Sequence, residues 1–194
     1  MLSAQLSYDI TDWLNISGRV RVDNTHTKYE QKLYASSNLT ITEESTQGHY
    51  TISKPDETQT YADVLANINK RFNDFSLVAN VGASIVNNRY EDLSYRGPIR
   101  EKGIPNVFNV FDLDNTKKKA RQDEWQEQTQ SIFASVEVGW KSMLYLTLTG
   151  RNDWASQLAN SSTPCFFYPS VGLSGVISEM LTLPEFIDYM KVRG

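Results

Sequence analysis

The sequence has few of the residues on which soluble enzymes and small secreted domains commonly depend. Cys165 is the only cysteine, which excludes an internal disulfide framework and a cysteine-based zinc site. The only histidines, His26 and His49, stand in polar stretches and are expected at the surface. The net charge of -4 lacks the basic footprint of a nucleic-acid-binding protein, so no nucleic-acid partner is expected.

Long apolar runs are also missing. No stretch approaches the roughly 20 apolar residues that a transmembrane helix needs. The first residues, MLSAQLSYDI, have neither the basic segment nor the apolar segment of a secretory signal. Membrane β-strands escape such a search, because only every second residue faces lipid.

What the sequence does have is a repeated alternation of apolar and polar residues, the pattern of half-buried β-strands. Val, Ile, Thr and Tyr are frequent in these stretches, as expected for strands. Many of the stretches are close to the roughly 9–11 residues of a tilted strand that crosses a bilayer, whereas soluble strands average about 5–6. The alternating stretches are residues 4–10, 14–23, 62–69, 76–85, 132–140, 144–151 and 167–178, and an eighth begins at Met190.

The connections alternate between short and long. Asp12-Trp13, Phe72-Asn73-Asp74 and Lys141-Ser142 are predicted as tight turns. Residues 25–58 and 91–127 are predicted as long polar loops, and 154–164 as a loop of intermediate length. Outer-membrane barrels have short periplasmic turns and longer external loops. The segment from Ser178 to Tyr189 departs from this rule, and we expect a brief interfacial helical turn there.

Aromatic and charged side chains fit two folds. The aromatic residues near the short turns suit a membrane–water interface, and they equally suit the ends of a soluble sandwich core; they are Trp13, Phe72, Phe75, Trp140 and Tyr145. The charged residues predicted to point away from the apolar face are Arg19, Arg21, Asp23, Asp63, Lys70, Glu137 and Arg151. They would face a barrel lumen or bulk solvent. The pattern alone leaves open a membrane barrel and a soluble antiparallel β-sandwich.

Three motifs in the last third of the chain are more specific. Thr149 to Ser156 reads TGRNDWAS, Phe166 to Ser174 reads FFYPSVGLS, and Met190 to Gly194 reads MKVRG. In this order they resemble the SusC/RagA family of TonB-linked outer-membrane transporters of Bacteroidota. The similarity is strong over about residues 130–194. The earlier part of the chain shares only the general pattern of strands and turns with the family.

The resemblance implies a transporter of the outer membrane of a Gram-negative bacterium. Its fold would be an antiparallel up-and-down transmembrane β-barrel of about 22 strands with a plug domain inside. It implies import of oligosaccharides or peptides, driven through TonB, with a SusD-like surface lipoprotein as partner. It implies neither catalysis nor a cofactor. Residues 1–194 would form part of the barrel domain, about seven to eight strands, without the plug and the TonB-contacting N-terminal region.

No catalytic or metal-binding residue is predicted. Asp112-Leu113-Asp114-Asn115 begins like a calcium loop, but the required glycine is missing and Lys117 to Lys119 occupy ligand positions. The carboxylate pairs Glu43-Glu44 and Asp123-Glu124 are expected to be solvated in loops, since nothing fixes the separation that glycosidases need.

Other loop features are also expected to be solvated. The basic run of Lys117 to Lys119 and Arg121 is expected at the surface, with lipopolysaccharide phosphates or a partner as the alternative contact. The sequons at Asn15, Asn38 and Asn160 matter only in a secreted eukaryotic protein. Pro169 is expected at a bulge near the rim, and Cys165 as a small strand-edge residue. Substrate contacts are expected in loops 25–58 and 91–127, from residues that the sequence does not identify.

Three functions remain from the sequence. Transport is the first, with substrate and outer-membrane lipids as contacts. A soluble carbohydrate-binding module with a β-sandwich fold is the second. An enzyme is the weakest, because no nucleophile–base or metal pattern supports it.

Overall fold

The computed structural model describes residues 1–181 and 188–194, and its strands form one antiparallel sheet. The order across the sheet is β1-β2-β4-β5-β6-β7-β8-β9, with β3 paired to β4. The strands are β1 (Leu2–Thr11), β2 (Leu14–His26), β3 (Tyr29–Leu33), β4 (His49–Phe72), β5 (Phe75–Pro98), β6 (Lys119–Trp140), β7 (Leu144–Ala155), β8 (Cys165–Val176) and β9 (Lys191–Arg193). The short helices are η1 (Val110–Asp112), η2 (Ser156–Leu158) and α1 (Ile177–Met180).

The chain divides into two compact units. Unit 1 comprises Met1–Val22, Thr60–Asn87 and Glu127–Gly194. Unit 2 comprises Asp23–Gln59 and Asn88–Gln126.

The strand registers of unit 1 place apolar residues opposite one another on one face. Val138, Leu146 and Leu173 form one cross-strand row over β6, β7 and β8. The next row is Val136, Leu148 and Val171. These side chains are exposed, with 58% of Leu173 and 71% of Val171 accessible. The predicted apolar face therefore exists, and nothing in the described residues covers it.

The opposite face of unit 1 is polar. Its rows include Ser135, Thr149 and Ser170, and then Glu137, Thr147 and Gly172. The same alternation holds between β1 and β2, where Ala4 pairs with Val20 and Gln5 with Arg19. A shift of one residue would exchange the two faces, so the unbroken β6–β7 and β7–β8 registers, and the β1–β2 register from Leu2 to Asp9, confirm the predicted alternation.

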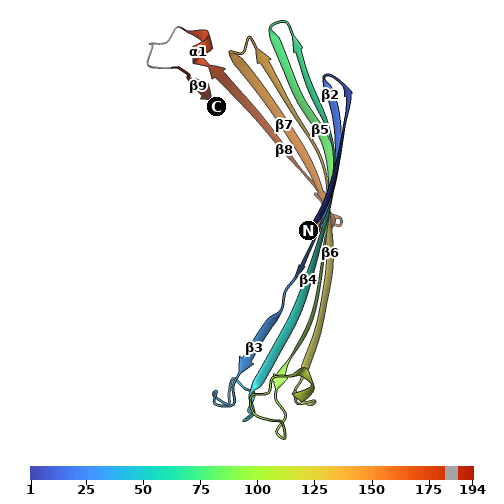
Figure 1. The fold of residues 1–194 in the computed structure, drawn as a ribbon, viewed down its shortest axis with the longest axis vertical. Helices are drawn as coiled ribbons and strands as arrows, with labels where there is room; N and C mark the ends of the chain where they lie inside the picture. The colour runs from blue at the N-terminus through green and yellow to red at the C-terminus, as the bar shows by residue number, and fades with distance from the viewer. Residues whose placement is uncertain (182–187) are drawn as a thin grey trace. The chain divides into compact units, whose positions relative to one another are not determined.

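The short turns of unit 1 lie together at one end of the sheet (Figure 1). The backbone N–H of Lys141 donates to the carbonyl of Asp74 at 2.7 Å, and that of Asn69 donates to the carbonyl of Trp13 at 2.9 Å. Asn73, Lys141 and Ser142 have the positive φ angles that tight turns demand. The predicted turns are confirmed. α1 supplies the predicted helical turn from Ile177, while residues 182–187 of that prediction lie outside the described residues.

The predicted long loops are the main error of the sequence reading. Residues 49–59, 88–98 and 119–126, assigned largely to loops 25–58 and 91–127, are strand, and Tyr29–Leu33 forms β3. The remaining loops are residues 34–48 and 99–118. These strands were predicted as loops because they carry charged residues on both faces, as in Lys54 to Glu57 and Arg89 to Asp92. Such residues hide the alternation of apolar and polar residues, but they do not prevent the backbone hydrogen bonds of a sheet.

The strands differ about twofold in length. β7 and β8 have 12 residues each, whereas β4 and β5 have 24 each. At about 3.3 Å per residue, 12 residues span about 40 Å, or about 28 Å along the bilayer normal at a tilt of about 45°. This matches the hydrocarbon thickness of about 30 Å. Strands of twice that length exceed it, so β4, β5 and β6 (22 residues) need a second environment.

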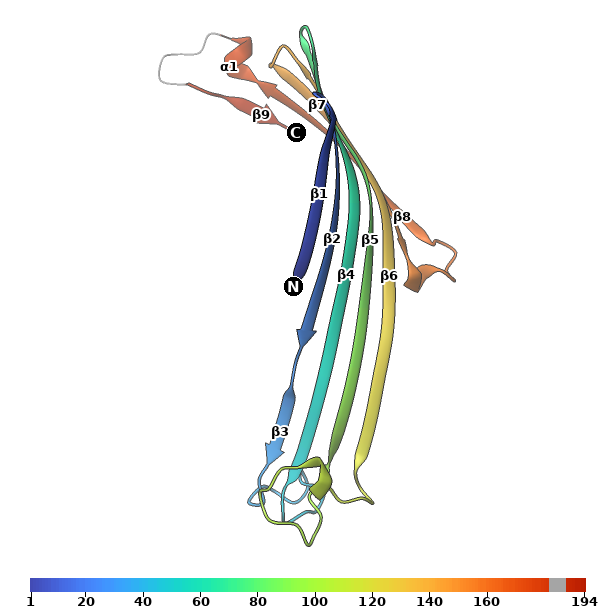
Figure 2. The ribbon, with the colours of Figure 1, turned by 45° about the vertical axis from the view of Figure 1, so that its right-hand side comes forward.

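The two loops of unit 2 lie together (Figure 2), and they share a small core. Ile99 and Leu113 are each 1% exposed and form a β-bridge within loop 99–118. The Phe108 ring packs edge-on against Tyr34 at 5.3 Å and lies 6.0 Å from Tyr50. Loops 34–48 and 99–118 therefore form one packed cap at the end of β4 and β5 rather than two solvated loops.

The alternative sandwich fold is not observed. A sandwich needs two sheets packed about 10 Å apart over a shared core. The described strands all belong to one sheet. The buried apolar residues of the described chain are Tyr50, Ala79 and Val176 in strands and Ile99 and Leu113 in loop 99–118. The expected bulge at Pro169 is also wrong, because the β7–β8 register runs unbroken through the pair Gly150–Pro169.

The ladder explains how proline is tolerated there. Leu173 exchanges both backbone hydrogen bonds with Gly194, so its N–H points away from β7. Pro169 lies four residues earlier and has the same orientation, because strand residues repeat every two positions. The N–H that proline lacks would thus face the edge of β8 opposite β7, and no β7–β8 bond is lost.

Candidate binding surface

The polar face of unit 1 carries an ion pair between neighbouring strands. The guanidinium of Arg19 on β2 lies 2.8 Å from a carboxylate oxygen of Asp63 on β4. The same guanidinium stands 5.3 Å from the centre of the Tyr61 ring. Asn67 on β4 donates to Asn15 on β2 at 3.3 Å. These contacts confirm that Arg19 and Asp63 lie on the predicted polar face and show that they pair with each other.

Arg151 organises the same face on β6 and β7. Its guanidinium donates to Ser131 at 3.0 Å and to Asp153 at 2.7 Å. It also lies 5.9 Å from the Phe133 ring. These contacts fix the orientation of the Arg151 guanidinium on the polar face.

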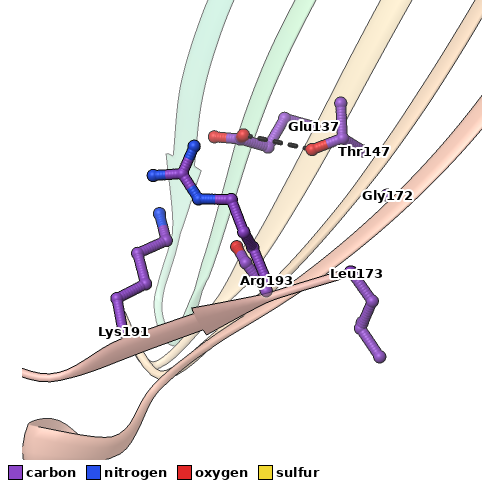
Figure 3. Close-up of a pocket in the computed structure, with 8 residues that line it drawn as sticks. Glu137, Thr147, Gly172, Leu173, Lys191 and Arg193 are labelled. Carbon is purple, nitrogen blue, oxygen red and sulfur yellow. Dashed lines mark hydrogen bonds between the residues drawn. The ribbon is translucent and has the colours of Figure 1, made fainter.

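A shallow depression of about 280 Å³ lies on the polar face near β9 (Figure 3). Lys191 and Arg193 extend from β9 toward Glu137 on β6, and Leu173 points to the other side (Figure 3). Thr147 donates to Glu137 at 3.3 Å. The ammonium of Lys191 lies 5.1 Å from the centre of the Tyr145 ring. The depression is thus lined by two cationic side chains, Lys191 and Arg193, and by the carboxylate of Glu137.

Lys70 does not lie where the sequence predicted it. It follows Ile68 by two positions on β4 and therefore shares the apolar face. Its ammonium lies 4.8 Å from the Trp13 ring centre and 5.2 Å from that of Phe72. Lys141 makes a similar contact with Trp140 at 5.4 Å. Long side chains extend an ammonium to water in this way at the edge of an apolar surface, beside interfacial aromatic rings.

Unit 2 has a separate pocket of about 330 Å³ beside Trp125. Asp23, Glu57, Gln59, Asn88 and Arg89 also line it. The Trp125 ring stacks on Tyr90 with a centroid distance of 5.5 Å and an angle of 11°. Gln59 donates to Asn88 at 2.9 Å. The pocket therefore combines a rigid aromatic wall with amide and carboxylate groups.

His49 contradicts its predicted surface position. It is 6% exposed at the start of β4, whereas His26 is exposed as expected and lies 2.7 Å from Asp56. The His49 ring faces Glu43 at 3.6 Å, and its Nδ1 is buried without a hydrogen-bond partner. Burial lowers the pKa of His49, and the Glu43 carboxylate opposes that shift. The polar loops fold over this residue, which a search for apolar runs does not reveal.

The carboxylates considered in the sequence have protein partners. Asp112 pairs with Arg100 at 2.7 Å, and Asp114 accepts the N–H and hydroxyl of Thr116. These hydrogen bonds lower the pKa of Asp114. Within residues 1–181 and 188–194, no three His, Cys, Asp or Glu side chains group as a metal site.

The two carboxylate pairs also contact cations. Glu43 faces Arg96 at 3.7 Å as well as His49, so its expected solvation is only partial. Glu44 lies 3.7 Å from Lys117. Asp123 pairs with Arg121 at 2.6 Å, and Glu124 pairs with Arg89 at 3.0 Å.

The basic run contributes to the cap. Lys117 donates to the carbonyl of Glu43 at 3.0 Å, and Lys118 donates to Asn115 at 3.1 Å. Lys119 begins β6. Cys165 begins β8 opposite Trp154, as a strand-edge residue should.

Sequence reasoning missed the aromatic residues of unit 2. Tyr90, Trp125 and Tyr50 all lay in segments assigned to loops or beside them. The sequence did contain one signal for Trp125. It stands six positions before Ser131, and residues an even number of positions apart in a strand share a face, so Trp125 lies on the polar face of β6. None of the described helices has the length and apolar character to span a bilayer.

The fold and both faces define the class of structure as a segment of an antiparallel up-and-down transmembrane β-barrel. No family model matches the sequence, and no curated protein is similar to it at a significant level. Solved structures do match. The chain is similar to the RagAB peptide transporter with a TM-score of 0.79 and 14% identity, over 98% of this chain and 21% of that one.

Two further structures support the same fold. The RagAB peptide importer in a closed-closed state matches with a TM-score of 0.65 and 15% identity, over 90% of this chain and 20% of that one. The siderophore receptor PiuA from Acinetobacter baumannii matches with a TM-score of 0.54 and 14% identity, over 90% of this chain and 29% of that one. At these identities the likeness establishes the fold. The chain spans 20–29% of the length of these structures.

Proposed function

We propose that this chain is part of the barrel wall of a TonB-dependent transporter in the outer membrane of a Gram-negative bacterium, and that it takes part in import rather than catalysis. One observation carries the proposal: unit 1 is a single sheet with an exposed apolar face and a polar face. The exposed apolar rows, such as Val136, Leu148 and Val171, need an apolar solvent. Lipid supplies it, and the polar face then lines the lumen.

The orientation follows from the connections. The short turns with Trp13, Phe72 and Trp140 are on the periplasmic side, where Lys70 and Lys141 reach the headgroups. Loop 156–164, at the other end of β7 and β8, is then extracellular. Unit 2 carries charged residues on both faces of its strands, so neither face is suited to hydrocarbon.

Partners and cargo follow from the motif resemblance and the likeness to RagAB. A SusD-like surface lipoprotein covers the extracellular side, TonB acts through a region outside this chain, and the cargo is an oligosaccharide or a peptide. Residues 1–194 are one stretch of the barrel domain, and the plug domain belongs to another part of the protein. From the motif resemblance we infer that the protein comes from a member of the Bacteroidota.

Cysteine labelling in cells tests the orientation. In the full-length protein, Cys165→Ser removes the native thiol of this chain, and Ser161→Cys or Asp74→Cys introduces a reporter in loop 156–164 or in a short turn. A membrane-impermeant maleimide should label position 161 in intact cells. It should label position 74 only after the outer membrane is permeabilised. Recovery of the protein in the soluble fraction, or labelling of both positions in intact cells, would contradict the proposal.

A further inference from the structure

The pocket beside Trp125 has the features of a small-ligand site. We propose that it binds a neutral glycan segment of the cargo, a site that deepens the proposed transport function and rests on it. Its volume of about 330 Å³ falls at the lower end of the roughly 300–1,000 Å³ range of ligand pockets. It therefore suits a short stretch of a longer chain rather than a whole oligomer.

Trp125 provides the apolar wall. It is 47% exposed in unit 2, whose strands carry charged residues on both faces and are therefore unsuited to a lipid interface. Tyr90 stacks on the ring in a nearly parallel arrangement and does not line the pocket. The stack fixes the orientation of the indole, so binding costs little side-chain entropy. The C–H face of a sugar ring is the apolar surface that packs on such a ring, while its hydroxyl groups remain at the edge.

The polar groups around the ring match hydroxyl groups. Gln59 and Asn88 are held together by their 2.9 Å hydrogen bond, and each primary amide has both donors and an acceptor. A sugar hydroxyl also donates and accepts. Thr25 and Thr58 add hydroxyls of the same kind to the lining. The pocket thus satisfies a ligand with alternating donors and acceptors and no net charge.

Charge favours a neutral ligand over an anionic one. The guanidinium of Arg89 is engaged by Glu91 and by Glu124. The carboxylates of Asp23 and Glu57 line the pocket as well. An acidic glycan would bring another negative charge close to these carboxylates, which is unfavourable.

Backbone pairing at the pocket leaves one place for an extended peptide. Peptides that join a sheet bind to a free strand edge, where main-chain groups are available. Gln59 and Asn88 lie on β4 and β5, and each of these strands has neighbours on both sides, so a ligand there meets side chains only. Trp125 lies on β6 before Thr129, where the pairing of β6 with β7 begins. A peptide would therefore have to bind along that edge of β6, and the peptide probe in the titration below tests this mode.

The test uses the full-length protein in detergent and isothermal titration calorimetry. The probes are maltohexaose, xylohexaose and mannohexaose as neutral glycans, hexagalacturonic acid as an acidic glycan, and a hexapeptide of glycine and alanine. We expect one of the neutral glycans to bind and the acidic glycan and the peptide to bind more weakly. Trp125→Ala should weaken binding of that glycan about tenfold or more, equivalent to about 1.4 kcal/mol.

Matched variants keep the result interpretable. Trp125→Phe should retain part of the affinity, and Trp154→Ala, which removes a similarly exposed indole from unit 1, should bind like the parent. Gln59→Leu should weaken binding while a folded barrel is retained, as judged by its heat-dependent electrophoretic mobility. Unchanged affinity in Trp125→Ala and Gln59→Leu overturns the glycan site. Tight peptide binding that depends on Trp125 overturns the ligand class.

Failure of this site is distinguishable from failure of the proposed function. If the cysteine reporters show the expected orientation but none of these glycans binds, the transporter stands and the glycan site is wrong. If the reporters fail and the glycan still binds through Trp125, the protein is a glycan-binding protein of another kind.

Discussion

The ring of Phe133 on β6 lies over the backbone of Gly82 on β5. A Cβ atom added at Gly82 would stand 2.7 Å from the Phe133 ring and 2.9 Å from the carbonyl oxygen of Val64. Both distances are shorter than van der Waals contact. Glycine inside a strand weakens the strand, and a neighbouring aromatic ring that covers it restores buried surface.

Replacement of that glycine should destabilise the sheet. Gly82→Ala forces the Phe133 ring and the β4 backbone to move, and such overpacking costs about 1–3 kcal/mol. The free energy of unfolding of the full-length protein, measured by urea titration in lipid vesicles, should fall by that amount. Gly172→Ala is the matched control, because its nearest atoms lie 3.8 Å and 4.0 Å away. Equal effects at both positions would show that the Phe133 contact is not responsible.

A charge on the apolar face should be costly, and the same charge one residue later should not be. Leu148 lies in an apolar row between Val136 and Val171, and Thr149 lies in a polar row between Ser135 and Ser170. Leu148→Arg should lower the free energy of unfolding in vesicles by about 2–4 kcal/mol. Thr149→Arg should change it by much less. A similar cost at the two positions would mean that the apolar face does not contact lipid.

The cap of unit 2 should loosen in acid. The folded-state pKa of His49 lies below its ordinary value of 6.5, chiefly because of burial, with Arg96 and Lys119 acting in the same direction. The unfolded chain therefore binds the proton more readily. The contribution of His49 to stability is full above pH 6.5 and is lost as the pH falls through the folded-state pKa.

Hydrogen exchange measures this loosening. Amides of residues 42–50 should exchange faster at about pH 5 than at about pH 8, after correction for the intrinsic rate. His49→Gln should remove this difference, since glutamine does not titrate. Exposed His26, which lies beside Asp56, gives the control variant His26→Gln, and that variant should keep the difference.

The hydroxyl of Tyr50 and the carboxylate of Glu30 join β3 to β4 through a 2.5 Å hydrogen bond. Burial first, and then this bond, raises the pKa of Tyr50 to about 12 from an ordinary 10.0. Its contribution to stability is full below pH 10.0 and is lost as the pH rises through about 12.

Tyr50→Phe should destabilise the β3–β4 pair at neutral pH. Loss of a hydrogen bond to a charged acceptor costs about 1–3 kcal/mol. Amide exchange of residues 29–33 and 49–53 should accelerate accordingly. Tyr29→Phe is the control, because Tyr29 is 52% exposed on the same strand pair. If only Tyr29→Phe accelerates exchange, the Tyr50–Glu30 bond is not the stabilising contact.

The strands of unit 1 could be predicted from the sequence. Each of these strands has an apolar face and a polar face, so the residue types of Leu146 and Thr147, for example, indicate which face each one occupies. The tight turns were equally readable, because Asn73 and Lys141 stand between alternating stretches. The pairing of Arg19 with Asp63 was not predictable, since it depends on the stagger between β2 and β4.

The strand segments of unit 2 were predicted as loops because their two faces do not differ in polarity. Strand residues such as Asp56, Glu57 and Glu91 place charge on both faces, which is the composition of a loop. Ladder hydrogen bonds form regardless of side-chain polarity, so these strands pair although neither face is apolar. The burial of His49 and the stacking of Tyr90 on Trp125 depend on loops and strands distant in sequence, so no local pattern indicates them.

Pro169 has a consequence for whatever lies against the outer edge of β8. At that position the edge offers a carbonyl but no N–H. A neighbouring strand that continues the register of β9 therefore leaves one of its acceptors unmatched opposite Pro169. In hydrocarbon such an orphaned carbonyl is costly, so a bulge or a water-accessible position is favoured at that point of the neighbour. The missing N–H of Pro169 thus helps to fix the register in which a neighbouring strand pairs with β8.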